Sequence, residues 1–174
     1  LTSNSNNNLI INNIINNNSQ YGVYLSASSN NNITNTNISN SGTKDVYLTS
    51  TSTNNVFLNS TYNISKELID AGSELIRKWY YKAYVNDTDG NNIPGANVSI
   101  YNVSGNLMYN MSTDTTGYTS IYNIIDYVNN GGTKTYYSNY TLYAESNVYN
   151  KISHVYNVSA NKNNPKDVFT LDVV

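Results

Sequence analysis

The sequence predicts an all-β protein in which the last coils of a parallel β-solenoid are followed by an antiparallel sandwich. A short motif returns at a nearly constant step before residue 62, and apolar and polar residues alternate strictly after residue 78. Disordered chains are poor in aromatic and β-branched residues, whereas aromatic residues reach 12% here and apolar residues 39%. The asparagine-rich tracts therefore indicate β structure.

Composition excludes several function classes. The net charge is -2 and charged residues make up only 11% of the chain, which is a poor match for a phosphate backbone, so nucleic acid is not an expected partner. The absence of cysteine excludes disulfides, thiolate-bound zinc and thiol catalysis. No apolar run approaches the roughly 18 residues that a membrane span needs.

Since Leu1 is not a natural start, we expect a fragment or a processed product.

Two anchors define the repeat. "NNL" at 7–9, "NNI" at 31–33 and "NNV" at 54–56 recur at steps of 24 and then 23. "GVYL" ends at Leu25 and "DVYL" ends at Leu48, which is again a step of 23. Two independent anchors with one short period are typical of a solenoid.

Short strands with one buried face are expected within each repeat, because apolar residues alternate there. The alternating pairs are Leu9 and Ile11, Val23 and Leu25, Val46 and Leu48, and Val56 and Leu58. The motif alignment also matches Leu9 and Ile14 with Ile33 and Ile38. Asparagine suits the corners between strands because it tolerates positive φ, and stacked coils would let its side-chain amides bond along the stack.

The stretch "GVYLSASSNNNITNTNISNSGTKDVYL" resembles the right-handed parallel β-helix repeats of the NosD-like type, which are common in archaeal and bacterial surface proteins. The resemblance covers residues 1–62. A solenoid needs about three repeats for stability, and this tract starts inside a repeat. The resemblance therefore implies more coils before residue 1.

Residues 63–77 are expected to form a capping hairpin or linker around "DAGS". A helix is the alternative, because Leu68 and Leu75, like Ile69 and Ile76, are seven positions apart. The turn-like "AGS" and the β-rich continuation favour the hairpin.

From residue 78 to residue 174 the pattern predicts about seven short strands, the expectation for an immunoglobulin-like sandwich. Trp79, Tyr81, Ala83 and Val85 share one face of the first strand. The last strand, "DVFTLDV", is expected to place Phe169, Leu171 and Val173 on one face. The segments "YVNDTDGNNIPGANVSIYN" and "STDTTGYTS" resemble carboxypeptidase-regulatory-like or CNA-B-like domains of surface proteins, which are sandwiches of this kind.

No catalytic constellation is predicted, so we expect a protein that is not an enzyme. His154 is the only histidine and lies mid-strand, and no G-x-S-x-G motif is present. Glycoside hydrolysis needs two carboxyl groups, but Asp45 is the only acidic residue before Tyr62.

One loop, "DTDGNN", has oxygen side chains at alternate positions around a glycine, a pattern that suits calcium. The candidate ligands are Asp87, Asp89 and Asn91. The loop lacks the closing glutamate of an EF-hand, and a plain hairpin turn is the alternative.

Two further sets of candidate residues lie on the expected surface. Asn-x-Ser/Thr sequons, which can carry glycans in a secreted protein, occur at Asn17, Asn32, Asn37, Asn59, Asn63, Asn86, Asn97, Asn102, Asn110, Asn139 and Asn157. A tyrosine cluster that could contact sugars or another protein copy consists of Tyr136, Tyr137, Tyr140 and Tyr143.

The resemblances imply a secreted, extracellular structural protein of a cell surface, archaeal in origin. We expect it to serve in an S-layer, sheath, filament or stalk, with other copies of itself or other surface proteins as partners. The alternative is a carbohydrate-binding, adhesin-like module in which tyrosines stack on sugars. Apart from calcium, no cofactor is expected.

Overall fold

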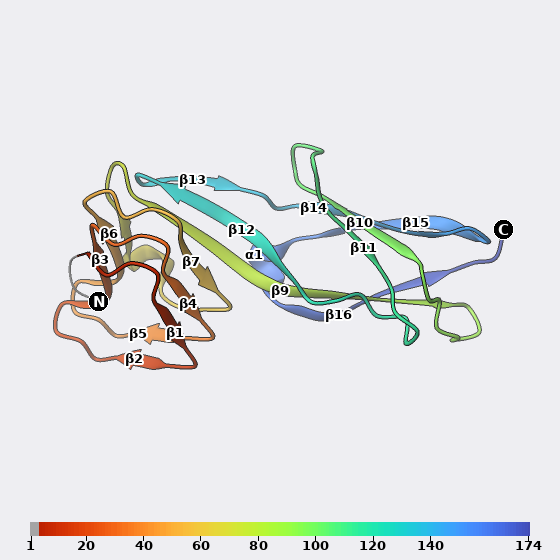
Figure 1. Ribbon diagram of the computed structural model, residues 1–174, viewed down its shortest axis with the longest axis horizontal. Helices are drawn as coiled ribbons and strands as arrows, with labels where there is room; N and C mark the ends of the chain where they lie inside the picture. The colour runs from red at the N-terminus through yellow and green to blue at the C-terminus, as the bar shows by residue number, and fades with distance from the viewer. Residues whose placement is uncertain (1–3) are drawn as a thin grey trace. The chain divides into compact units, whose positions relative to one another are not determined.

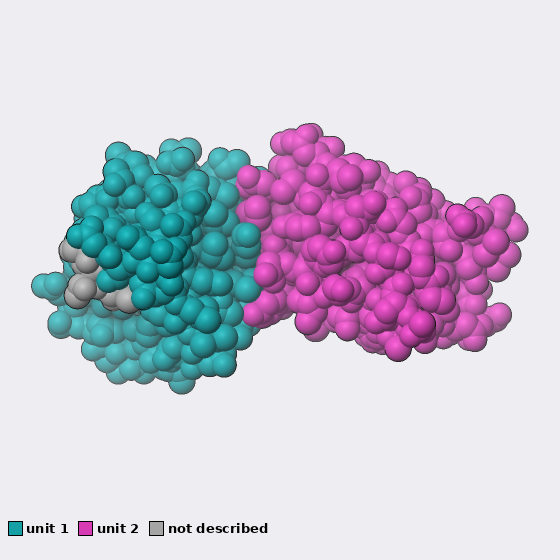
Figure 2. All heavy atoms as spheres, in the orientation of Figure 1, with its two compact units in different colours: residues 1–78, 127–136 teal, residues 79–126, 137–174 magenta. Residues whose placement is uncertain are grey.

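The computed structural model describes residues 4–174; the first three residues of the predicted solenoid lie outside the described residues. Two compact units make up the chain (Figure 2). Unit 1 comprises residues 1–78 and 127–136, and unit 2 comprises residues 79–126 and 137–174. The division falls inside two strands, β9 (Glu74–Asp87) and β12 (Tyr122–Asn130).

Unit 1 is a β-solenoid of about three turns, whose strands pair in parallel from coil to coil (Figure 1). Three stacks run along it, in the orders β1-β4-β7-β9, β2-β5 and β3-β6-β8. The strands are β1 (Leu9–Ile11), β2 (Ile14–Asn16), β3 (Tyr21–Ser26), β4 (Asn32–Thr34), β5 (Asn37–Ser39), β6 (Lys44–Thr49), β7 (Asn55–Leu58) and β8 (Glu67–Ile69). Val23, Leu25, Val46 and Leu48 are buried as the alternation predicts.

The register of the first stack differs by one residue from the predicted alignment. Ile10, Ile33 and Phe57 lie above one another, whereas the sequence motif aligned Leu9, Ile33 and Val56. Leu9 is consequently 64% exposed, because a one-residue shift moves a strand side chain to the other face. The same shift pairs Ile15 with Ile38 and leaves Ile14 exposed.

Asparagine ladders set this register. Asn31 Oδ1 accepts hydrogen bonds from the backbone N–H and from Nδ2 of Asn8, at 3.0 and 2.9 Å. The N–H and Nδ2 of Asn31 in turn donate to Asn55 Oδ1, both at 3.0 Å. The ladder therefore uses the second asparagine of the first and third motifs, Asn8 and Asn55, but the first asparagine of the second motif, Asn31. Tandem asparagines make this choice ambiguous in the sequence.

Asparagine also turns the corners of the coils. Between residues 4 and 59, nine of the twelve non-glycine residues with positive φ are asparagines. A left-handed backbone costs most residues energy, and asparagine is one of the few side chains that tolerate it. The asparagine content of the solenoid therefore has two structural causes, the corners and the ladders.

Residues 63–77 form a third coil in place of the predicted capping hairpin. β8 pairs in parallel with β6, and the start of β9 pairs in parallel with β7. A serine ladder continues into this coil, because Ser73 Oγ accepts from the N–H of Ser52 at 3.1 Å. The alternative helix is wrong, because Leu68 and Ile69 lie in β8 and Leu75 and Ile76 lie in β9. The one helical segment in this stretch is a short 3₁₀ turn, η1 (Ile64–Lys66).

A hairpin from later in the chain completes unit 1. The end of β12 pairs antiparallel with β13 (Thr133–Tyr136), and Tyr127 belongs to the solenoid core. The N–H of Gly131 donates to the carbonyl oxygen of Ser73 at 3.0 Å. The sequence division placed residues 127–136 in the second domain, whereas the structure places them in unit 1.

Unit 2 contains an antiparallel sheet in the order β11-β10-β14-β15, and β16 pairs in parallel with β9. Its strands are β10 (Asn97–Tyr101), β11 (Leu107–Ser112), β14 (Tyr140–Ser146), β15 (Tyr149–Tyr156) and β16 (Asn164–Leu171), together with one short helix, α1 (Val158–Asn161). The four predicted core residues of β9 are buried, as are Phe169 and Leu171. Val173, predicted to join them, is 65% exposed because β16 ends at Leu171.

One core lies between this four-stranded sheet and the strands β9, β12 and β16, which belong to the seven-stranded sheet. Ile100 and Leu142 enter it from the first sheet, and Trp79 and Phe169 enter it from the second. Within residues 4–174, no helix is long and apolar enough to cross a membrane.

Candidate contact surfaces

A tyrosine stripe runs along the outer face of the β3-β6-β8 stack. We define it as Tyr21, Tyr24, Tyr47 and Leu68. Tyr24, Tyr47 and Leu68 are register partners in three successive coils, and the three tyrosine rings lie 5.3 Å apart, centroid to centroid. Tyr24 and Tyr47 point outward because their strand neighbours, such as Val23 and Leu25, fill the core, and the Tyr21 ring contacts both of them.

The hydroxyl of Tyr47 is held in place by the next coil. It donates to Asp70 Oδ2 at 2.8 Å, and this hydrogen bond raises the pKa of Tyr47. Sequence reasoning did not single out this stripe. The signal was present in "GVYL" and "DVYL", where the residue between two core positions must face outward.

The tyrosines predicted as a contact cluster do not form one surface. Tyr136 belongs to unit 1 and is 46% exposed. Tyr140 is fully buried and donates to the carbonyl oxygen of Ile125 at 2.7 Å, so its prediction as a contact residue is wrong. Tyr137 is half-buried against the core of unit 2. Tyr143 lines a depression on the outer face of the four-stranded sheet.

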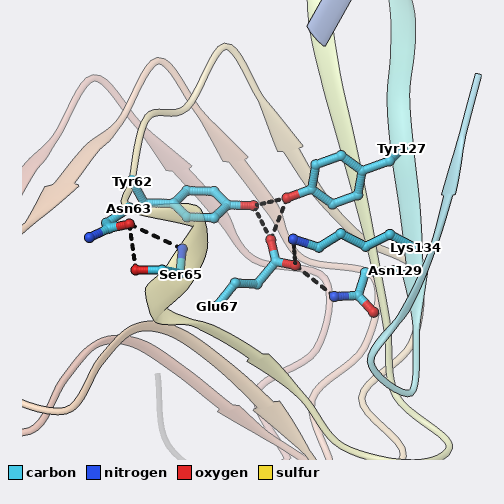
Figure 3. Close-up of polar contacts among 7 residues, drawn as sticks. All are labelled: Tyr62, Asn63, Ser65, Glu67, Tyr127, Asn129 and Lys134. Atoms are coloured by element: carbon cyan, nitrogen blue, oxygen red, sulfur yellow. Dashed lines mark hydrogen bonds and ion pairs between the residues drawn. The ribbon is translucent and has the colours of Figure 1, made fainter. Parts of the chain in front are cut away.

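Glu67 of β8 is a carboxylate whose side chain is 0% exposed. Figure 3 shows the four side chains that contact it, those of Tyr62, Tyr127, Asn129 and Lys134. Its Oε2 accepts from the hydroxyls of Tyr62 and Tyr127, at 2.6 and 2.5 Å. Its Oε1 accepts from Asn129 Nδ2 at 2.6 Å and pairs with Lys134 Nζ at 3.1 Å. Three of these four partners come from the 127–136 hairpin, so the cluster ties that hairpin to the third coil.

Burial is the largest cause of the raised pKa of the two phenols in this cluster. Burial first, and then the negative charge of Glu67, raise the pKa of both Tyr62 and Tyr127. The guanidinium of Arg77 lies 5.0 Å from the centroid of the Tyr62 ring. Both phenols therefore stay protonated and donate at neutral pH. This arrangement is that of a structural cluster, because both carboxylate oxygens of Glu67 are used in holding the fold.

The candidate calcium residues form a hairpin turn. Asp87 Oδ1 accepts from the N–H groups of Asp89 and Asn91, at 3.0 and 2.8 Å, and Asp87 Oδ2 accepts from Asn91 Nδ2. The same turn recurs at Asn102, whose Oδ1 accepts from residues 104 and 106. Because Asn102, an uncharged amide, accepts the same two backbone hydrogen bonds, the Asp87 carboxylate needs no cation to explain this turn. Among residues 4–174, no group of three or more acidic, histidine or cysteine side chains gathers as a metal site.

A third copy of the turn begins at Asp114, which accepts from Thr116 and Tyr118. The Asn91 side chain lowers the pKa of Asp87, and the Thr116 hydroxyl lowers that of Asp114. A lowered folded-state pKa contributes stability above the unfolded value of about 3.9 and loses it as pH falls through the folded value.

We therefore predict that the unfolding free energy of the wild type falls as the pH drops below about 4 and that the fall is smaller in an Asp87→Asn/Asp114→Asn double variant. Urea unfolding at several pH values measures this. An equal fall in both proteins would show that these turns contribute nothing to the pH dependence.

His154, which lies mid-strand in β15, takes part in a polar contact with Asp167. Its Nε2 lies 2.9 Å from Asp167 Oδ2, which also accepts from the Tyr81 hydroxyl at 2.7 Å. The imidazole ring stacks on Phe169 with centroids 4.5 Å apart. This contact joins β15 to β16.

None of the eleven sequon asparagines is buried. Seven are exposed, at Asn17, Asn32, Asn37, Asn63, Asn110, Asn139 and Asn157, and four are half-buried, at Asn59, Asn86, Asn97 and Asn102. Some of these asparagine side chains make hydrogen bonds within the fold. Asn63, for example, caps η1 by accepting from the N–H and hydroxyl of Ser65 (Figure 3).

Fold and surfaces together define an all-β protein whose first unit is a β-solenoid. No family model matches the chain, and no curated protein matches it. Among solved structures, the chain is similar to the Bacillus anthracis TIE protein, with 18% sequence identity and a TM-score of 0.42. The match covers 63% of this chain and 20% of that chain, so this chain spans about a fifth of that protein.

Proposed function

We propose that this protein is a structural component of an extracellular cell surface, such as an S-layer, sheath, filament or stalk. The supporting observation is the tyrosine stripe, which presents Tyr24, Tyr47 and Leu68 in register along the coils of unit 1. Contiguous aromatic surface of this kind favours contact with another protein. The partner is another copy of the same chain or a second surface protein.

The interior of the solenoid suits a load-bearing role. Ladders of Asn8, Asn31 and Asn55, and of Ser28, Ser52 and Ser73, bond each coil to the next in addition to the strand pairing. Such ladders resist separation of the coils, because each buried amide would lose its partners.

The proposal also assigns each of the two units to a known type of β fold. We assign unit 1 to the NosD-like β-helices of archaeal and bacterial surface proteins, and unit 2 to the immunoglobulin-like sandwiches. The two sheets that share one core in unit 2 support the second assignment. Glycans on the exposed sequons would add hydration to a surface that carries few charges.

Electron microscopy of the protein taken from producing cells tests this function. An ordered sheet, tube or filament with this chain as its repeating unit is expected. For the purified chain, a Tyr24→Ser/Tyr47→Ser double variant should need at least about tenfold more protein to assemble, because truncating two central aromatic residues typically costs more than about 1.4 kcal/mol.

Tyr136→Ser is the matched control, since it removes an exposed tyrosine of unit 1 outside the stripe and should assemble like the wild type. Dispersed wild-type monomers at every concentration would refute self-assembly. Equal assembly of the double variant and the control would show that the stripe is not part of the assembly interface.

A further inference from the structure

The outward face of β10, β14 and β15 in unit 2 is hollowed by two adjoining depressions. One has a volume of about 700 Å³ and the other about 570 Å³, and Lys151 lines both. Alternation along β14 sends Leu142 and Ala144 into the core and leaves Thr141 and Tyr143 facing outward. The hollow therefore lies over a rigid, paired sheet, which is a suitable floor for a binding site.

Two tyrosines form a corner in the larger depression. The rings of Tyr101 and Tyr143 are perpendicular, at 90°, with centroids 5.6 Å apart. Lys151 Nζ lies 4.6 Å from the centroid of the Tyr143 ring, so the Tyr143 ring contacts both Tyr101 and Lys151. A pair of fixed rings offers flat apolar surface with hydroxyl groups at the edge.

The charges in the two depressions cancel locally. Lys151 Nζ pairs with Glu145 Oε2 at 3.1 Å, and Asn97 Nδ2 donates to Glu145 Oε1 at 3.2 Å. These hydrogen bonds, from Asn97 first and Lys151 second, lower the pKa of Glu145. Every other residue lining the two depressions is uncharged, including the amides Asn102, Asn139 and Asn147.

We propose that this face binds a short, uncharged oligosaccharide. Pyranose rings have an apolar C–H face that can pack on Tyr101 or Tyr143, and hydroxyls that can bond to the surrounding amides and to Thr141. A nucleic acid or acidic polymer would need unpaired cations, and a lipid would need a predominantly apolar lining. The perpendicular rings together with balanced charge fit a neutral sugar best.

The test uses the whole chain made in a host without N-glycosylation, so that no sugar linked at Asn102 or Asn139 fills the depressions. Binding is measured on an array of neutral and acidic oligosaccharides, and the Kd of the strongest ligand is then determined by calorimetry. Neutral oligosaccharides should be selected. Tyr143→Ala should raise the Kd at least about tenfold, within the range for loss of one central aromatic residue, whereas Tyr143→Phe should keep most of the affinity.

Tyr136→Ala is the matched control, because it removes an exposed tyrosine of unit 1 that lines neither depression and lies outside the tyrosine stripe, and it should leave the Kd unchanged. Circular dichroism of each variant shows whether the fold is kept. Binding of no oligosaccharide, selection of acidic ones, or an unchanged Kd in folded Tyr143→Ala would each overturn the proposal. The result is independent of self-assembly through the tyrosine stripe, which the microscopy tests separately.

Discussion

Replacing Asn31 by leucine is expected to lower the unfolding free energy of unit 1 by about 2–4 kcal/mol. Asn31 is buried in the middle of the ladder, where it accepts two hydrogen bonds from Asn8 and donates two to Asn55. Leucine has a similar volume but removes the acceptor and one donor, so polar groups of both neighbours lose a partner at once. Urea unfolding followed by circular dichroism measures the loss.

An exposed asparagine of the same unit is the control. Asn16 of β2 has the same side chain but is exposed to solvent. Asn16→Leu should therefore change the unfolding free energy by less than about 0.5 kcal/mol. Equal effects of the two substitutions would mean that the ladder does not stabilise the solenoid.

Replacing Glu67 by alanine is expected to cost about 3–5 kcal/mol, the usual range for breaking a buried ion pair by removing one partner. The substitution would leave Tyr62, Tyr127, Asn129 and Lys134 without their shared acceptor. Because three of these belong to the 127–136 hairpin, its backbone amides should exchange hydrogen faster than in the wild type. Amide hydrogen exchange and urea unfolding together measure the change.

Glu145→Ala is the matched control for this substitution. The Glu145–Lys151 pair has the same 3.1 Å separation as the Glu67–Lys134 pair, but the Glu145 side chain is 43% exposed. Exposed pairs contribute only about 0–1 kcal/mol, so the two substitutions should differ severalfold. A small effect at Glu67 would show that the hairpin is held by apolar packing of Tyr127 instead.

Local periodicity was sufficient to predict the strands. The recurrence of the "NNL", "NNI" and "NNV" motif at a nearly constant step predicted a solenoid, and the alternation from Trp79 to Val85 predicted a strand with one buried face. Both patterns follow from the geometry of a single strand or coil, so they can be read without knowing the pairing partner. The asparagine corners are local for the same reason, because positive φ is a property of one residue.

The candidate contact residues were predictable only in part. Tyr24 and Tyr47 could have been found, since their neighbours Val23 and Leu25 had already been assigned to the core. The burial of Tyr140 could also have been predicted, because Tyr140 shares a strand face with Leu142 and Ala144, which alternation places in the core. Its hydrogen bond to Ile125 could not, since that depends on a strand that the sequence does not identify as a neighbour. The meeting of Tyr101 with Tyr143 likewise depends on which strands pair.

The sequence by itself determined that this protein is built of β strands, that its first part is a solenoid, and that asparagine turns its corners. Only the tertiary structure decided the one-residue register of the first stack, the third coil at 63–77 and the place of the 127–136 hairpin in unit 1. The physical reason is the range of the interactions. Backbone preference and side-chain alternation act within a few residues, whereas the asparagine ladder and the Glu67 cluster join side chains that are far apart along the chain, as in the Asn8–Asn31 and Glu67–Asn129 hydrogen bonds.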